Sequence, residues 1–249
     1  MNDDVARHCA EIDRCNQRGG RMLSVVDLID AETFTPELAA YALAAIGRGA
    51  SFMVGAAPGG AGKTTVMGAL LNLVPAKVQL APADAMAAIR RGLQAPDPPQ
   101  CFICHEIGRG SYYAYLWGAE LRAYFDLPAA GHMLATNLHA DTIDQAHGQI
   151  CGDCNVSEDA FAGMKLMFFL AVRRAGLAVR RRIASVWESD GSSPHRQVFQ
   201  GGSPFEIDAS ALVDPEAFNR ARRRVDELLA GGGRTIEDVR SILASDGGE

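Results

Sequence analysis

The chain has 249 residues, 48% of them hydrophobic and 22% charged, which are ordinary proportions for a globular protein with one sizeable α/β domain or two small ones. Its net charge of −6 argues against a protein that binds nucleic acid non-specifically. No stretch is apolar over the length needed to span a bilayer, and the acidic start Met1-Asn2-Asp3 is unlike a secretory signal. We therefore expect a cytoplasmic protein whose six cysteines are reduced thiols.

The first part of the chain predicts a helix and a strand ahead of a glycine-rich loop. Residues 1–22 are polar without a clear periodicity, which fits either a short helix or a loose terminus. The pair Thr35-Pro36 is typical of an N-cap and a first helical residue, so we expect a helix over 36–46. The apolar run 51–54 predicts a strand that leads into the loop, and a second helix is expected over 63–73.

Strands and helices alternate through the middle of the chain. The predicted strands are 78–80, 101–104, 132–136, 166–172 and 180–187, the last two joined around Gly176. The predicted helices are 84–93, an aromatic-rich 111–125, 141–150, 215–229 and 235–243. This order predicts an α/β fold whose mainly parallel sheet has an antiparallel extension. We expect a helical N-terminal segment over 1–50, a core over 51–200 and a helical tail over 201–249.

A phosphate-binding loop motif lies between the strand 51–54 and the helix that follows it. Its residues are Ala57, Pro58, Gly59, Gly60, Ala61, Gly62, Lys63, Thr64 and Thr65, which fit G-x-x-x-x-G-K-[ST] apart from alanine at the first position. Glycines let successive backbone N–H groups face phosphate oxygens, and the helix adds the positive end of its dipole. The motif predicts a Mg·ATP site in which Lys63 contacts the β- and γ-phosphates and Thr64 coordinates Mg²⁺.

Three further polar residues stand next to apolar strands of the core. Glu106 follows the strand that begins at Cys101, where it can hold Mg²⁺ through water or orient the attacking water. A solvated surface glutamate fits the same spacing equally well. His139 stands just past the end of a strand, in the place of a γ-phosphate sensor, and His132 stands at the start of that strand. Spacing alone favours a structural role for either histidine.

The combination of these motifs resembles the secretion ATPases, which power type II secretion, type IV pili, conjugative type IV secretion and tight-adherence export. That family has a G-E pair after an apolar strand, where this chain has His105-Glu106. It then has a segment of the form G-H-(apolar stretch)-[ST]-[TS]-L-H, the His box. The segment from Gly131-His132 to Leu138-His139 matches it at the same length. The resemblance covers about residues 23–200.

The resemblance implies a RecA-like P-loop core that converts ATP hydrolysis into motion of an inner-membrane platform protein. The protein would be cytoplasmic or peripheral at the inner membrane. Glu106 would act on the water, and His132 and His139 would sense the nucleotide. Family members form hexameric rings and carry an N-terminal domain, whereas about fifty residues precede the loop here. We therefore expect a monomer or a weak homo-oligomer, with low activity until a partner binds.

Two departures from the family pattern support an alternative function. The acidic box that normally follows the P-loop helix is reduced to Asp84, and the arginine after the G-E pair is displaced to Arg109. The alternative is a nucleotide-binding switch that does not hydrolyse ATP and acts by binding a partner. Arginine clusters at 180–182 and 220–224 are interpreted as solvated faces, or as contacts for an acidic partner or a neighbouring subunit.

Two cysteine pairs have the C-x-x-C spacing of metal ligands. Cys101 and Cys104 lie in a predicted strand, where they point to opposite faces and cannot bind one ion, so we expect no stoichiometric zinc. Cys151 and Cys154 are expected in a turn. The sequence leaves open whether this second pair binds metal, forms a redox pair or is merely solvated.

Overall fold

A mixed sheet runs through the computed structural model of the chain, which describes residues 3–16, 19–57, 59–95, 98–110, 112–175 and 178–245. Pro58, Ser111 and Gly176, on which sequence predictions fall, lie outside the described residues. The strands are β1 (Phe52–Gly55), β2 (Gln79–Pro82), β3 (Gln100–Ile107), β4 (Tyr115–Leu116), β5 (Met133–Leu138), β6 (Leu166–Ala175), β7 (Ala178–Glu188) and β8 (Arg196–Gln200). Their order across the sheet is β2-β3-β5-β1-β6-β7-β8, with β4 paired to β3.

The pairing of the strands confirms the predicted fold class. β2, β3, β5, β1 and β6 are mutually parallel, and the connections between them contain helices that cross back over the sheet. β7 and β8 add to β6 in antiparallel fashion through short connections. The fold is therefore α/β, with a mainly parallel sheet and an antiparallel extension.

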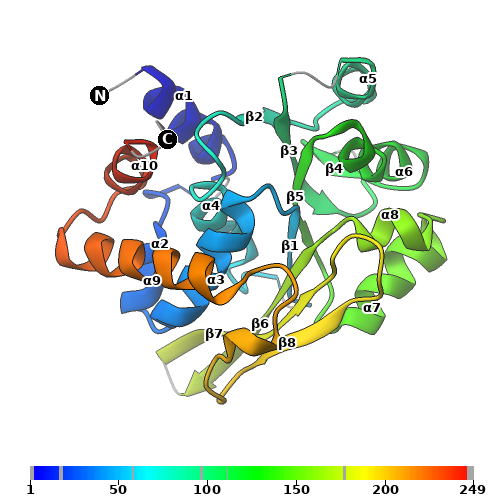
Figure 1. Cartoon of the computed structure of the whole chain (residues 1–249). Coiled ribbons are helices and arrows are strands. Elements are labelled where there is room, and N and C mark those ends of the chain that lie inside the picture. The colour runs from blue at the N-terminus through cyan, green and yellow to red at the C-terminus, as the bar shows by residue number, and fades with distance from the viewer. Residues whose placement is uncertain are drawn as a thin grey trace.

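The helices cover both faces of the sheet, as Figure 1 shows. They are α1 (Asp3–Arg14), α2 (Val25–Asp30), α3 (Pro36–Gly47), α4 (Lys63–Leu71), α5 (Met86–Gln94), α6 (Ala119–Phe125), α7 (Ile143–His147), α8 (Glu158–Ala162), α9 (Pro215–Ala230) and α10 (Ile236–Ala244), with 3₁₀ turns η1 (Leu127–Ala130) and η3 (Ile207–Ala209) and a π-helix η2 (Gly148–Asp153). The N- and C-terminal helices lie on one face and α5 to α8 on the other. None of the helices in the described ranges combines the length and the apolar character that crossing a bilayer requires.

The part of the chain before the glycine-rich loop contains the helices α1 and α3. Thr35 caps α3 as predicted, its hydroxyl accepting the Leu38 N–H at 3.2 Å. The first residues, for which the sequence allowed a helix or a loose terminus, form α1. Val5, His8, Cys9 and Ile12 are its buried residues, at a helical spacing that the polar residues around them conceal in the sequence.

The prediction of one aromatic-rich helix over 111–125 is wrong. Only the second half is helical, as α6, and the first half contains the short strand β4, which pairs with the end of β3. Gly118 separates the two at φ 58° and ψ −121°, a conformation that a residue with a side chain avoids. Tyr112 and Tyr113 remain 70% and 46% exposed, so they do not pack on the sheet as a helix face would.

The predicted helix over 141–150 is shorter and continues differently. α7 ends at His147 and passes into the π-helix η2, whose last residue is Asp153. Cys151 therefore lies in a helical segment rather than in the predicted turn. The short helix α8 follows, capped by the Ser157 hydroxyl, which accepts the Ala160 N–H at 3.2 Å. The sequence analysis did not predict α8.

One buried carboxylate joins the end of β7 to the helical layer. Glu188 is 1% exposed and accepts hydrogen bonds from the Tyr41 hydroxyl at 2.6 Å, the Ser210 hydroxyl at 2.7 Å and the Arg196 guanidinium at 2.9 Å. Burial by itself raises the pKa of Glu188, but these bonds and one from the Ala211 N–H outweigh it and hold the pKa below the ordinary value. The charged form is the one that the fold stabilises.

Glu188→Gln is expected to lower the free energy of unfolding by about 1.5–3 kcal/mol at pH 7, the usual cost of losing hydrogen bonds to a buried charged group. Because the pKa of Glu188 is lowered in the folded state, this stabilisation is complete above the unfolded pKa of about 4.3 and is lost as the pH falls through the folded pKa. Urea unfolding at pH 7 and in the acid range measures both effects. The exposed Glu206→Gln is the matched control, and equal stabilities of the two variants at pH 7 would contradict the prediction.

Candidate functional site

Three polar segments meet at one edge of the sheet because parallel strands end there together. β5 lies between β1 and β3, in register through Val54↔Asn137 and Cys104↔Thr136. The phosphate loop follows β1, Glu106 lies near the end of β3, and His139 follows β5 directly. Crevices outside the carboxyl ends of such strands are the usual ligand sites of open α/β sheets.

The side chains of Lys63, Glu106 and His139 converge at this edge. The Lys63 ammonium lies 3.4 Å from Oε2 of Glu106 and 3.2 Å from Nδ1 of His139. It also donates to the Ala56 carbonyl at 3.3 Å. His139 Nδ1 is also 3.0 Å from the Ala57 carbonyl, and Nε2 lies 3.5 Å from Lys63 and 3.7 Å from Oε2 of Glu106.

Glu106 is the electrostatically unusual member of this group. Its side chain is 9% exposed, and Oε1 accepts no hydrogen bond from any described residue. Burial raises the pKa of Glu106, while the charge of Lys63 and the neighbouring His139 oppose the rise. A buried carboxylate oxygen without a partner costs about 1–3 kcal/mol, so it is positioned for a group that arrives with a ligand, such as a water molecule.

The backbone of the loop is shaped for anions. Gly60 and Gly62 have φ of 80° and 100°, and among the described residues no side chain caps the start of α4. The first N–H groups of this helix are therefore left for a ligand. Ala57 is not among the residues with positive φ, so alanine replaces the first glycine of the motif without backbone strain. Its N–H donates to Asp141 at 2.7 Å, a contact that the sequence analysis missed.

Arg181 is a second residue that the sequence analysis did not place at the site. It comes from β7, donates to the Gly60 carbonyl at 3.4 Å, and lies so close to the loop that a Cβ on Gly62 would stand 3.0 Å from its Cδ. The sequence indicated only a charged cluster at 180–182. Its position depends on β6 pairing with β1, which carries the β6–β7 hairpin alongside the loop.

A cavity of about 350 Å³ opens beside the loop on the same side as Arg181. Apolar side chains of Leu23, Leu28 and Val66 line it together with Thr65 of the motif. The cavity is continuous with the phosphate loop through Gly60 and Gly62. It has the mixed apolar and polar lining that is usual for small-molecule sites.

The structure does not bring His132 to the site. This histidine precedes β5 and His139 follows it, so roughly 20 Å of extended strand separates the two residues. His132 Nδ1 accepts the Gln100 N–H and Nε2 donates to the Gly92 carbonyl, each at 3.0 Å. Both ring nitrogens are occupied by backbone groups, so His132 joins β5 to the segments around β3 and α5.

Two further candidates, Asp84 and Arg109, come from the departures from the family pattern. Asp84 is exposed after β2, and Arg109 lies over the ring of Trp117 at 5.1 Å from its centroid. Cys101 and Cys104 are both buried, on opposite faces of the sheet as predicted, one in each hydrophobic cluster.

The fold and the loop together define an α/β protein with a mainly parallel sheet and a glycine-rich loop between β1 and α4. No protein-family model matches the chain, and no curated protein sequence matches it. Among solved structures it is similar to the VirB11 ATPase of the Brucella suis type IV secretion system, determined in complex with sulphate. The two are 16% identical over 59% of this chain and 50% of that one, with a TM-score of 0.43.

The chain is also similar to the ATPase DotB from two organisms. The Yersinia pseudotuberculosis structure is 12% identical over 87% of this chain and 62% of that one, with a TM-score of 0.46. The Legionella pneumophila structure is 12% identical over 82% of this chain and 62% of that one, with a TM-score of 0.42. The chain thus spans between 50% and 62% of the length of these three structures.

Proposed function

We propose that the chain binds Mg·ATP at the phosphate loop and hydrolyses it, as an ATPase subunit of a secretion or pilus assembly machine. The observation that carries this proposal is the convergence of Lys63, Glu106 and His139 at the end of the P-loop strand. A cation for phosphate, a buried acid for water and a polar sensor are the groups that phosphoryl transfer to water requires. The His-box pattern of the sequence directs the proposal to the secretion machines.

Phosphate binding uses the loop backbone and Lys63. The N–H groups around Gly60 and at the start of α4 surround the β-phosphate, and the Lys63 ammonium turns from Glu106 to the phosphate oxygens. Thr64 and, through water, Glu106 are the residues that hold Mg²⁺. The ion, when bound, neutralises charge on the β- and γ-phosphate oxygens. The nucleoside occupies the cavity that Leu23, Leu28 and Thr65 line.

Hydrolysis follows from the release of Glu106. When phosphate draws Lys63 away, the Glu106 carboxylate loses its ion-pair partner and is free to accept a proton from water, while its burial raises its pKa. A raised carboxylate pKa suits a general base working near neutral pH. Oε1, which has no partner among the described residues, is the atom placed to accept the proton of the attacking water. Binding of phosphate by Lys63 is thereby coupled to the release of Glu106 as the general base.

His139 transmits the state of the nucleotide to the helices beyond the site. Its ring contacts Lys63, and its carbonyl accepts the Gln149 amide at 2.9 Å. The Asp141 carboxylate, two residues further on, accepts a hydrogen bond from the Ala57 N–H of the loop. Movement of Lys63 towards phosphate breaks its contact with the His139 ring, and the backbone bonds carry the displacement to α7 and η2.

The partner in this proposal is an inner-membrane platform protein, and the working assembly is a ring of copies of this chain. The sequence resemblance supports both. Light scattering coupled to size exclusion, with and without Mg·ATP, measures the self-association, for which we expect a weak, nucleotide-promoted oligomer. A nucleotide-independent hexamer with rapid turnover and no partner would contradict the expected dependence on a partner.

The switch that binds nucleotide without hydrolysis remains the second candidate. The observation that favours it is the reduced acidic box. Asp84 is its one candidate in the sequence, and Asp84 is exposed after the edge strand β2. Steady-state release of phosphate from ATP, measured on the assembled protein with Mg²⁺, separates the two functions. Turnover that Lys63→Ala removes supports the ATPase. Tight ATP binding without turnover in the assembled protein supports the switch.

Arg181→Ala is expected to weaken binding of ATP about tenfold, the loss of roughly one charge-assisted contact at a partly exposed position. Arg181 bonds to Gly60 and is within reach of phosphates seated in the loop. The matched control is Arg182→Ala, because Arg182 pairs with Glu32 at 2.5 Å. Calorimetric titration with a non-hydrolysable ATP analogue compares the two. Unchanged or tighter binding by Arg181→Ala would show that Arg181 covers the loop instead of contacting the ligand.

A further inference from the structure

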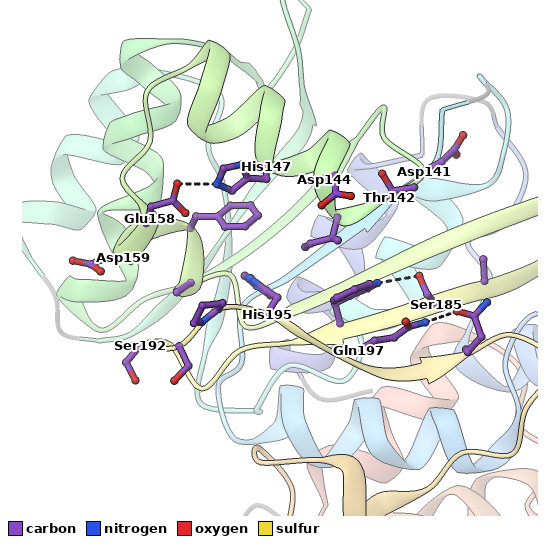
Figure 2. Close-up of a pocket in the computed structure, with 18 residues that line it drawn as sticks. Asp141, Thr142, Asp144, His147, Glu158, Asp159, Ser185, Ser192, His195 and Gln197 are labelled. Carbon is purple, nitrogen blue, oxygen red and sulfur yellow. Dashed lines mark hydrogen bonds and ion pairs between the residues drawn. The ribbon is translucent and has the colours of Figure 1, made fainter.

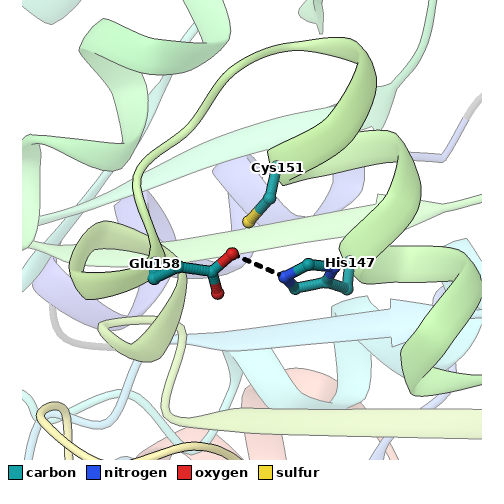
Figure 3. A group of neighbouring side chains, drawn as sticks. All are labelled: His147, Cys151 and Glu158. Carbon is teal, nitrogen blue, oxygen red and sulfur yellow. Dashed lines mark hydrogen bonds and ion pairs between the residues drawn. The ribbon is translucent and has the colours of Figure 1, made fainter.

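A mixed group of donor side chains lies outside the phosphate site, at the junction of α7, η2 and α8 (Figure 3). His147 is the last residue of α7, Cys151 lies within η2, and Glu158 is the first residue of α8. One ligand atom from each, the imidazole nitrogen, the thiol sulfur and a carboxylate oxygen, lies within 4.8 Å of the other two. Figure 3 shows the three side chains pointing into one space between the helical segments.

Local chain geometry brings these three residues together. His147 and Cys151 are four residues apart on a continuous helical segment, so their side chains lie on the same face. The Val156 N–H donates to the Ile150 carbonyl at 3.1 Å, which folds the chain back after η2 and directs Glu158 towards that face. π-helical turns of this kind are rare and often occur at functional sites.

The ion pair between His147 and Glu158 does not by itself explain why three donor side chains lie together here. His147 Nε2 lies 2.7 Å from Glu158 Oε1, but the two side chains are 46% and 72% exposed, and such pairs contribute little to stability. The Cys151 thiol belongs to the same group, although the His147–Glu158 pair forms without it. Burial and the nearby Glu158 raise the pKa of Cys151 to about 12, so it is not a reactive thiolate.

We propose that His147, Cys151 and Glu158 bind one zinc(II) ion. Imidazole, thiolate and carboxylate are the ligand types that zinc accepts, whereas Mg²⁺ and Ca²⁺ prefer oxygen ligands. Ligand atoms around tetrahedral zinc lie roughly 3.5 Å apart. The His147–Glu158 hydrogen bond of 2.7 Å therefore opens when zinc binds, and the longer separations, all within 4.8 Å, close. Three protein ligands leave a fourth position for water.

The surroundings of the group fit this role. The Phe161 ring stands edge-on to His147 at 5.4 Å between centroids, which fixes the plane of the imidazole. His147 and Glu158 line a cavity of about 890 Å³, which gives the ion an entry path and the fourth position access to solvent (Figure 2). Binding displaces the thiol proton of Cys151, so affinity falls as the pH is lowered.

The proposal replaces the sequence expectation of a zinc-free chain. That expectation rested on Cys101 and Cys104, which do lie on opposite faces of the sheet. It did not foresee that Cys151 would meet a histidine and a glutamate instead of Cys154. The site is also tied to the nucleotide edge, because Gln149 of η2 holds the His139 carbonyl. Zinc at this position therefore stiffens the segment next to His139.

Zinc titration of the full chain, freed of metal and carrying no histidine tag, tests the site directly. The titration is made without nucleotide, in competition with a chromophoric chelator. We expect one equivalent of zinc, bound at least tenfold more weakly by Cys151→Ser and by His147→Asn. Cys154→Ser, which changes the neighbouring buried cysteine outside the group, is the matched control and should bind as the unmodified chain does.

Substitution of cobalt(II) for zinc identifies the ligands independently of affinity. We expect a thiolate-to-cobalt charge-transfer band that disappears in Cys151→Ser and persists in Cys154→Ser and in Lys63→Ala. Persistence in Lys63→Ala separates this site from the nucleotide site. A chain that takes up no zinc, or that binds zinc and shows the cobalt band equally well after Cys151→Ser, overturns the proposal.

Discussion

Lys63→Ala is expected to abolish tight binding of ATP. Its ammonium is the cation at the mouth of the loop, and the structure holds it in a buried position between Glu106 and His139. Removing one charged partner of a desolvated pair costs about 2–5 kcal/mol, which corresponds to roughly 30-fold to several thousand-fold in affinity. Calorimetric titration with a non-hydrolysable ATP analogue and Mg²⁺ measures the loss.

A second variant distinguishes a loss of ATP binding from a loss of folding. In Lys63→Ala the carboxylate of Glu106 stays buried without its cation, and breaking a buried pair in this way costs about 3–5 kcal/mol of stability. The double variant Lys63→Ala/Glu106→Gln removes both charges and should remain folded without binding ATP. Lys77→Ala, at an exposed lysine, is the matched control. ATP affinity that survives in the folded double variant would refute the assignment of the phosphate loop.

Glu106→Gln is expected to retain ATP binding and to lose hydrolysis by about 10²–10⁴-fold, the usual contribution of a general base. Glutamine keeps the shape of the side chain but cannot take a proton from water. It also removes the carboxylate that pairs with Lys63 at 3.4 Å, so affinity for ATP should stay the same or rise. Single-turnover release of phosphate measures the chemical step, and calorimetry measures the binding.

The pH dependence of the unmodified chain gives a second readout of the same residue. Burial raises the pKa of Glu106 above its ordinary value, and the active form is the deprotonated one. As the pH is lowered, the rate should therefore begin to fall above the ordinary glutamate pKa of about 4.3. Glu120→Gln, at an exposed glutamate, should leave both the rate and this profile unchanged. Hydrolysis by Glu106→Gln at the unmodified rate would exclude Glu106 as the base.

Local patterns in the sequence were sufficient for the parts of the fold that depend on neighbouring residues. The Thr35-Pro36 start of α3, the strand before the phosphate loop and the helix after it were all predicted, because capping chemistry and apolar runs act over a few residues. The failure over 111–125 has an equally local cause. The backbone angles at Gly118 end the preceding segment, but glycine in a sequence does not reveal which angles it adopts.

The meeting of Lys63, Glu106 and His139 was predictable in outline because each follows an apolar strand, and parallel strands end at one edge. The same reasoning places His139 at this edge and His132 at the opposite one, because the two histidines stand at opposite ends of one strand. The expectation that His132 also senses the nucleotide came from the family resemblance, and the structure gives His132 backbone partners instead.

The sequence by itself determined the α/β class, the strand and helix that flank the glycine-rich loop and most of the order of strands and helices, because these depend on hydrophobic periodicity and on short motifs. Only the tertiary structure decided which distant residues join them. Arg181 reaches the loop because β6 pairs with β1, and Asp141 holds Ala57 because β5 ends beside it. Cys151 meets Glu158 because the chain folds back after η2. Contacts of this kind depend on strand pairing and chain reversal, which no local pattern of side chains specifies.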